Sequence, residues 1–227
     1  MLTGEDVCAA LDPLGTAEAG AARAALRGRV AGDDAAFDRL YPDHVRRLSW
    51  LHWTPVAVAS RAAVLLAPEP GMRVLDAGAG PGKLCCLGAL GHGGTWHGIE
   101  LNPSLCAAAT AAAARLGVAD RTRFDAGDMH ELDWRRYDSL YFYNPFEAVV
   151  FGGPATGDRW AAFADQVART QARLAGLSRG TRVVTFHGFG GAMPPGFARA
   201  AVETIGDGEL ALWIKQRRPG PARVISG

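Results

Sequence analysis

The chain has 227 residues, of which 48% are hydrophobic and 21% are charged. This length can bury the core of one well-packed α/β domain with a short extra segment, and it is too small for two full domains. The 24 basic and 23 acidic side chains give a formal net charge of +1. That balance excludes a global field that would draw the molecule to nucleic acid or to an anionic membrane. A short basic cluster at residues 215–218 is typical of a solvated end, with a local basic patch as the alternative.

The cysteines and the first residues indicate a compartment. The four cysteines show neither metal-ligand spacing nor a disulfide framework, so we expect small buried hydrophobes in a reducing environment and no metal site. They are Cys8, Cys85, Cys86 and Cys106. Glu5 and Asp6 precede any apolar run, which argues against a secretory signal, and no run approaches the length of a membrane span. We therefore expect a soluble, cytoplasmic protein.

Residues 1–48 are alanine-rich and charged, and their helical patterns break at Pro13, near Gly28 and at Pro42. No strand pattern occurs among them. We predict an N-terminal helical cap of two or three short helices, followed by the main domain over residues 49–227. A packing appendage is one role for such a cap.

The next segment predicts a helix that starts at a threonine and a proline. Thr54 is a favoured helix cap, Pro55 suits the first helical position, and an apolar stripe follows along residues 56–66. This explains Thr54 structurally, although a helix N-terminus also suits a ligand carboxylate. The side chains beside it that can wall a pocket are Trp50, His52 and Trp53, and core packing is the alternative for the two tryptophans.

A strand, a glycine-rich turn and a helix follow one another in residues 73–90. The apolar run ending at Leu75 predicts a buried strand, Asp76 follows it, and leucines recur at helical spacing after the turn. The turn glycines are Gly78, Gly80 and Gly82. Neither the dinucleotide pattern G-x-G-x-x-G nor the G-K-[ST] ending of a phosphate-binding loop is present. An acid at the mouth of the turn disfavours a pyrophosphate and favours a ligand with a cationic amine or sulfonium.

Residues 95–100 predict the second strand, which ends in an acid. Glu100 lies about 20 residues past the turn, where a carboxylate can accept hydrogen bonds from both ribose hydroxyls. This placement fits a nicotinamide cofactor as well as S-adenosylmethionine. Asn102 and Pro103 then predict the start of a helix that ends at Gly117, and residues 123–129 predict a third short strand followed by a turn.

An asparagine, a proline and an aromatic residue stand at the end of another predicted strand, residues 140–143. In an open α/β sheet, that end is where ligands bind. The Asn144 amide oxygen and the Pro145 carbonyl can accept the hydrogens of an amine, and the Phe146 ring can stack on a planar substrate or contact a sulfonium. Glu147 could accept a proton, bind a cationic substrate or be solvated. The structural alternative is that Asn-Pro only forms a β-turn at the end of the strand.

The last third predicts a helix over residues 156–177, a strand over 182–187 and a final strand over 209–215. His187, at the end of the second of these elements, either faces the pocket or is satisfied by the backbone of the glycine-rich loop that follows. No internal repeat occurs.

With an acid ahead of G-x-G-x-G, a second strand that ends in an acid and the Asn-Pro-Phe segment, the chain resembles the class I S-adenosylmethionine-dependent methyltransferases over roughly residues 50–216. The resemblance implies an α/β, Rossmann-like, doubly wound and mostly parallel seven-stranded sheet with an antiparallel last strand. It implies that Asp128 takes the adenine amino group, with Asp125 as a substitute, and that the Met129 backbone contacts the ring. The cofactor contacts it implies are Thr54, Asp76, Gly78, Gly80, Gly82, Glu100, Asp128, Met129 and Asn144. In such enzymes an N-terminal extension often covers the substrate side.

The segment Asn144-Pro145-Phe146 is similar to the Asn/Asp-Pro-Pro-Tyr/Phe motif of amino-group methyltransferases but lacks one proline. It is also similar to the Asn-Asn-Phe segment of the non-SET histone lysine methyltransferases. We therefore expect methyl transfer to a nitrogen held by these catalytic residues, and the acceptor stays open between a nucleobase, a protein side chain and a small molecule. The alternatives are a nicotinamide-dependent oxidoreductase, for which no Tyr-x-x-x-Lys pair is present, and a non-catalytic S-adenosylmethionine-binding module.

Overall fold

A computed structural model describes residues 16–47, 53–146 and 159–216. The predictions made for Cys8, Trp50, His52 and Glu147, and for the last two residues of the basic cluster at 215–218, lie outside the described residues.

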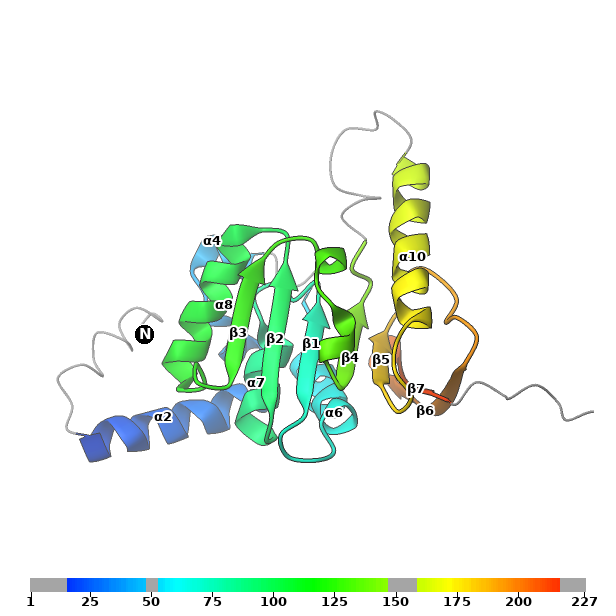
Figure 1. The fold of residues 1–227 in the computed structure, drawn as a ribbon. Coiled ribbons are helices and arrows are strands. Elements are labelled where there is room, and N and C mark those ends of the chain that lie inside the picture. The colour runs from blue at the N-terminus through cyan, green and yellow to red at the C-terminus, as the bar shows by residue number, and fades with distance from the viewer. Residues whose placement is uncertain (1–15, 48–52, 147–158, 217–227) are drawn as a thin grey trace, which may run out of the picture.

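A single seven-stranded sheet organises the molecule, in the order β3-β2-β1-β4-β5-β7-β6 (Figure 1). Its strands are β1 (Arg73–Ala77), β2 (Thr95–Glu100), β3 (Thr122–Ala126), β4 (Ser139–Tyr143), β5 (Arg182–Phe186), β6 (Phe197–Ile205) and β7 (Gly208–Lys215). Strands β1 to β5 pair in parallel with one another, and β7 runs antiparallel to both β5 and β6. This confirms the predicted mostly parallel, doubly wound sheet with its antiparallel end.

The strand that the sequence patterns do not predict is β6. It lies at the edge of the sheet beyond β7, and its residues are mostly exposed or half-buried. Its pairing with β7 shifts register between Arg199 and Ala201, which interrupts the two-residue alternation by which a strand is recognised.

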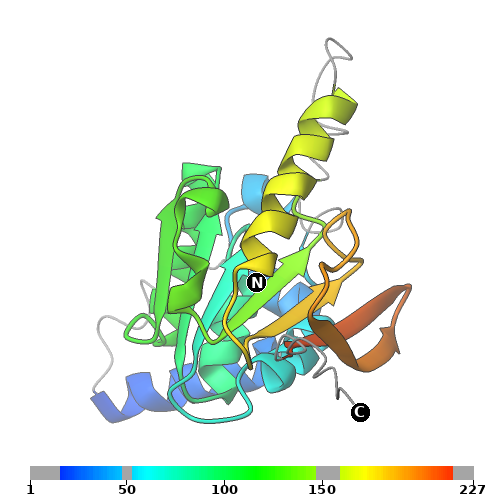
Figure 2. The ribbon, with the colours of Figure 1, turned by 45° about the vertical axis from the view of Figure 1, so that its right-hand side comes forward.

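Helices cover both faces of the sheet (Figures 1 and 2). The α-helices are α2 (Thr16–Val30), α3 (Asp34–Asp38), α4 (Asp43–Arg46), α6 (Val56–Leu66), α7 (Lys83–Gly91), α8 (Pro103–Leu116) and α10 (Arg159–Ala175), and two 3₁₀ turns are η1 (Met129–Glu131) and η2 (Trp134–Arg136). Within the described ranges, no helix combines the length and the apolar character needed to cross a membrane.

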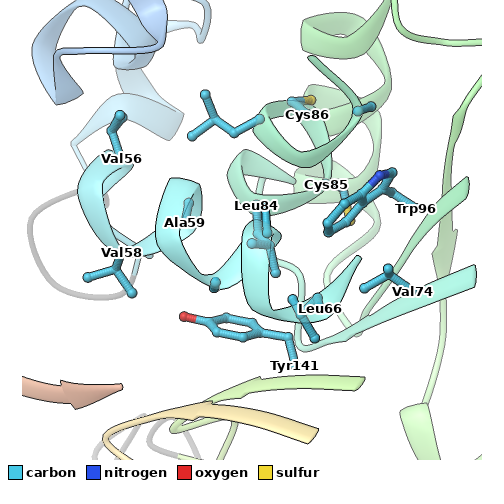
Figure 3. Close-up of a cluster of buried hydrophobic side chains, with 14 of the residues drawn as sticks. Val56, Val58, Ala59, Leu66, Val74, Leu84, Cys85, Cys86, Trp96 and Tyr141 are labelled. Atoms are coloured by element: carbon cyan, nitrogen blue, oxygen red, sulfur yellow. The ribbon is translucent and has the colours of Figure 1, made fainter. Parts of the chain in front are cut away.

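Two hydrophobic clusters lie on opposite faces of the sheet because successive strand side chains point in opposite directions. Val74 faces the helices α6, α7 and α8, whereas Leu75 faces α10 and the 3₁₀ turns. In the first cluster Trp96 lies against α7 near Leu84 (Figure 3). A side chain at Gly88 would meet the Trp96 ring at 2.4 Å, so the close approach of α7 to the sheet requires a glycine there.

The N-terminal helices share this first cluster with the main domain. Their fully or nearly fully buried side chains are Val30, Phe37, Leu40, Tyr41 and Val45. The Arg27 guanidinium also donates hydrogen bonds to two carbonyls at the end of α8, those of Leu116 at 2.8 Å and Gly117 at 3.0 Å. The segment is therefore packed into the body of the protein.

The start of α6 differs from the predicted cap. The helix begins at Val56, and the side chain of the preceding residue, Pro55, does not cap it. Instead the Val56 N–H donates to the Asp34 carboxylate at 3.0 Å, and the Thr54 hydroxyl lies 3.4 Å from that of Tyr141. A carboxylate from the N-terminal segment thus caps α6 in place of Thr54, the cap that the sequence predicted. The cap of α8 is as predicted, with Asn102 accepting from the Ser104 N–H at 2.9 Å.

Candidate functional site

The turn between β1 and α7 depends on three glycines with positive φ. Gly78, Gly80 and Gly82 have φ values of 84°, 52° and 80°, which side chains with a Cβ rarely adopt. A Cβ at Gly82 would also lie 2.5 Å from the Phe124 ring, whereas a Cβ at Gly80 would meet nothing within 4 Å. The turn is therefore packed at its last glycine and open at its middle one.

The carboxylate of Glu100 ties the tip of β2 to this turn. One oxygen accepts the Gly80 N–H at 3.0 Å and the other accepts the Asn102 N–H at 3.0 Å. The Ile99 carbonyl accepts two further N–H groups of the turn, from Gly78 and Ala79, both at 3.0 Å. Since each carboxylate oxygen has a second lone pair, Glu100 keeps the capacity to accept from a pair of hydroxyls.

A small pocket that opens to solvent lies at the carboxyl ends of β1 and β4. This is the point where the sheet order reverses, the usual ligand position in such sheets. Of the residues singled out from the sequence, those that line the pocket are Trp53, Thr54, Asp76, Gly78 and Gly80. The others that line it are Ala79, Pro81, Lys83, Leu84 and Tyr143.

Asp76 presents a buried carboxyl group to this pocket. Asp76 is the second-last residue of strand β1, and it is only 4% exposed. Burial raises its pKa to about 7; a hydrogen bond from the Cys85 thiol, 3.8 Å away, opposes that rise in pKa, and the Glu100 charge adds to it. A cationic ligand in the pocket would favour the ionised form.

Lys83, the first residue of α7, places a buried cation beside the turn. Its side chain is 3% exposed, and Nζ lies 2.7 Å from an oxygen of Asp34 and 2.8 Å from one of Asp38. The rings of Phe37 and Trp53 lie 5.4 and 5.5 Å from Nζ. Sequence reasoning used Lys83 only to exclude a phosphate-binding loop; its position directly after the turn is the signal that could have placed it at the pocket.

Asp128 is held by groups of the protein. One oxygen accepts the His130 N–H at 2.8 Å and lies 3.0 Å from the imidazole Nδ1, and the other lies 3.1 Å from Arg169 on α10. Burial raises the pKa of Asp128, but these hydrogen bonds and charges outweigh it and lower the pKa. Met129 beside it is buried, and Asp125 instead pairs with Arg123 on β3.

Asn144 and Pro145 lie against the glycine turn. Asn144 follows β4 with a φ of 37°, an uncommon conformation for a residue with a side chain, and its N–H donates to the Gly188 carbonyl at 3.0 Å. Pro145 packs so close to Gly78 that a Cβ there would lie 3.2 Å from the proline Cβ. Phe146 is 5% exposed and does not line the pocket.

The ring of Phe146 belongs to the cluster under α10. It stacks on His130 at a centroid distance of 6.1 Å and meets Phe163 edge-on at 6.4 Å. The aromatic residue that lines the pocket next to Asn144 is Tyr143. Which of these two aromatic residues, three positions apart, faces the pocket depends on the turn after β4, which the sequence pattern does not specify.

His187 reaches the pocket only through a neighbour. It follows β5 with a φ of 54°, and its ring stacks on that of Tyr143 at 5.8 Å. Its backbone N–H donates to the Glu209 carbonyl at 3.3 Å, and its Nε2 lies 3.9 Å from Asp207.

The sheet order, the glycine turn after β1 and the acid at the tip of β2 are those of the Rossmann-like fold of class I methyltransferases. The model of a family described as a methyltransferase domain matches residues 68–173 of this chain, the range that holds the glycine turn, Glu100 and the Asn144-Pro145-Phe146 segment.

One curated protein and two solved structures illustrate what the chain is similar to. The chain is 39% identical over 64 residues to the uncharacterized protein YjhP of Escherichia coli (strain K12), which is 28% of this chain and only 26% of that protein. An RNA methyltransferase from Salinibacter ruber, solved with S-adenosyl-L-homocysteine, has 24% identity and a TM-score of 0.56 over 74% of this chain and 96% of that one. TrmN from Thermus thermophilus has 24% identity and a TM-score of 0.51 over 73% and 55%. At these identities the structures show a shared fold.

Proposed function

We propose that this protein transfers the methyl group of S-adenosylmethionine to a nitrogen atom held beside Asn144 and Pro145. The observation that carries the proposal is the contact of Pro145 with Gly78. It brings the predicted acceptor segment against the predicted cofactor turn, at a pocket that Asp76 and Tyr143 both line.

The donor set suits such a cofactor. Glu100 would accept from the ribose hydroxyls with the lone pairs that its two backbone partners leave. Asp76, whose pKa of about 7 lets it ionise when a cation is near, would face the sulfonium side of the ligand. Asp128 and the Met129 backbone would take the adenine, with Asp128 already oriented by His130 and Arg169.

The cofactor supplies an electrophilic methyl group on a sulfonium centre. The chain's own contribution is placement, because the Asn144 amide oxygen and the Pro145 carbonyl would accept the hydrogens of the acceptor amine and aim its lone pair. Effective-molarity arguments allow such placement to lower the barrier by roughly 7–11 kcal/mol. Tyr143, which lines the pocket, would take the aromatic wall role expected of Phe146.

Two observations bear on the acceptor. The similar Salinibacter ruber structure is an RNA methyltransferase, which supports a nucleic-acid acceptor. The net charge of +1 gives no general attraction for long nucleic-acid tracts, so recognition would have to be local.

The test separates cofactor binding from methyl transfer. S-adenosylhomocysteine is titrated calorimetrically into the wild type and into Asn144→Gly, which removes the amide and keeps the left-handed backbone accessible. We expect both to bind within about 3-fold of each other, while transfer of a radiolabelled methyl group falls at least about 100-fold in the variant.

The same transfer assay is run on lysate treated with nuclease or with protease, and loss of label under one treatment identifies the acceptor class. The exposed acid Asp120 gives a matched control, since Asp120→Ala should alter neither readout. The absence of any heat with the wild type, or displacement of the ligand by NADH, would overturn the proposal. Full transfer by Asn144→Gly would remove the assigned role of Asn144.

A further inference from the structure

The N-terminal segment touches the glycine turn directly, although it lies outside the matched range 68–173. The Tyr41 hydroxyl donates to the Pro81 carbonyl at 2.8 Å across 40 residues of sequence. Asp34 and Asp38, at the two ends of α3, both pair with Lys83. The segment therefore holds two residues that line the pocket.

The ammonium group of Lys83 has more hydrogens than described oxygen partners. An ammonium carries three N–H donors, and among the described residues its oxygen partners are the two carboxylates of α3. With the side chain 3% exposed, bulk water gives little compensation. Because Lys83 lines the pocket, a ligand oxygen there would complete its hydrogen bonding.

We propose that Lys83, held by Asp34 and Asp38, binds the carboxylate of the α-amino-acid end of the methyl donor, so that the N-terminal segment forms part of the donor site. The inference rests on the proposed function and goes beyond it, since it gives that segment a role in recognising the ligand. A charge-assisted bond to a carboxylate is among the stronger polar contacts available in a buried site.

The two acids of α3 also make this cation compatible with a positively charged ligand. A single buried ammonium beside the pocket would repel a sulfonium, because Coulomb interactions are strong where water is excluded. Asp34 and Asp38 more than balance the charge of Lys83. The arrangement thus offers a hydrogen bond to the ligand carboxylate without a net positive field at the sulfonium.

The test compares two ligands that differ only at the amino-acid end. S-adenosylhomocysteine and 5′-methylthioadenosine share the nucleoside and the thioether, and only the first carries a carboxylate. We expect the full-length wild type to bind S-adenosylhomocysteine more tightly. In Lys83→Met we expect its affinity to fall about 10- to 100-fold, with less than about a 3-fold change for 5′-methylthioadenosine. An equal loss for both ligands, or no loss for either, would overturn the inference.

Two further variants guard against a trivial result. Lys83→Gln/Asp38→Asn replaces the buried ion pair by amides, so it keeps the test available should Lys83→Met unfold. Arg115 anchors the same segment by donating to the Leu40 carbonyl away from the pocket, and Arg115→Gln should leave the ratio of the two affinities unchanged. A wild type that binds neither ligand defeats the proposed function together with the inference, whereas binding without discrimination by the variants defeats the inference alone.

Discussion

Asp76 makes the stability of the folded protein depend on pH. Its carboxyl group is enclosed at the end of β1, and burial raises the pKa to about 7 from 3.8. At a pH between these two pKa values, the Asp76 carboxyl group is ionised in the unfolded chain and protonated in the folded chain. A rise in pH through that range therefore favours unfolding. Above the pKa of the folded state, the full free-energy cost of burying the ionised carboxylate lowers the stability. For a rise of about three units this cost is on the order of 4 kcal/mol.

This predicts that Asp76→Asn is more stable than the wild type at pH 8 in the absence of ligand, by up to about 4 kcal/mol. The advantage should shrink as the pH falls through 7 and vanish near pH 4, where the wild-type carboxyl is neutral in both states. Urea unfolding of both proteins from pH 4 to pH 8.5 measures the difference directly. A difference that does not change with pH would show that Asp76 titrates normally in the folded protein.

At this scale the sequence predicted where a residue lies when its position follows from chain order. Asp76 and Glu100 stand at the ends of recognisable strands, and such ends meet at one edge of a parallel sheet. Lys83 and Tyr143 were missed as pocket residues, because their exposure depends on neighbours far away in sequence, such as Asp34. The orientation of Phe146 depends likewise on α10.

Among the elements, the turn between β1 and α7 separates two requirements for glycine. Gly80 needs a positive φ but has open space where a side chain would be, whereas Gly82 also lies against Phe124 and Ala109. The first position is adjacent to the ligand pocket, and the second joins the turn to the core of the domain.

We therefore expect Gly80→Ala to cost about 1–2 kcal/mol of folding free energy, the penalty for a left-handed residue. Gly82→Ala should cost about 2–5 kcal/mol, because overpacking adds to that penalty. Chemical denaturation of the two variants measures both values. Similar losses in the two proteins would mean that Phe124 moves aside without cost.

The elements themselves were predicted in type but not in every boundary. The first five strands and the cap of α8 follow from apolar runs and from an Asn-Pro start. The start of α6 was misassigned because its N–H group is capped by Asp34, 22 residues earlier. Local propensity carries no information about a partner at that distance.

On the scale of the whole molecule, the N-terminal helices and the main domain share one core. The predicted boundary at residue 48 falls between side chains that pack together, since Phe37 and Tyr41 belong to the same cluster as Trp53 and α6. The boundary was inferred from a change in composition and helical pattern. Composition does not report packing between distant segments, and it is this packing that joins the N-terminal helices to the main domain.

Removal of residues 1–47 should accordingly abolish cooperative folding. It strips five buried side chains from the core, each worth about 1.5–3 kcal/mol, against a total stability of about 5–15 kcal/mol for an ordinary domain. Thermal unfolding followed by circular dichroism tests this. The exposed pair of the same segment, Asp43 and Arg46, provides the control, and Asp43→Ala/Arg46→Ala should change stability by less than about 1 kcal/mol. A truncated chain with the melting curve of the full protein would contradict the prediction.

Trp53 has one more consequence. Its indole lines the pocket and lies 5.5 Å from the Lys83 ammonium, so its surroundings change when a molecule enters. The protein thus has an intrinsic fluorophore at the pocket, and the emission of Trp53 can report ligand binding in real time without any label. The exposed indole of Trp160 on α10 supplies a steady background against which that signal is measured.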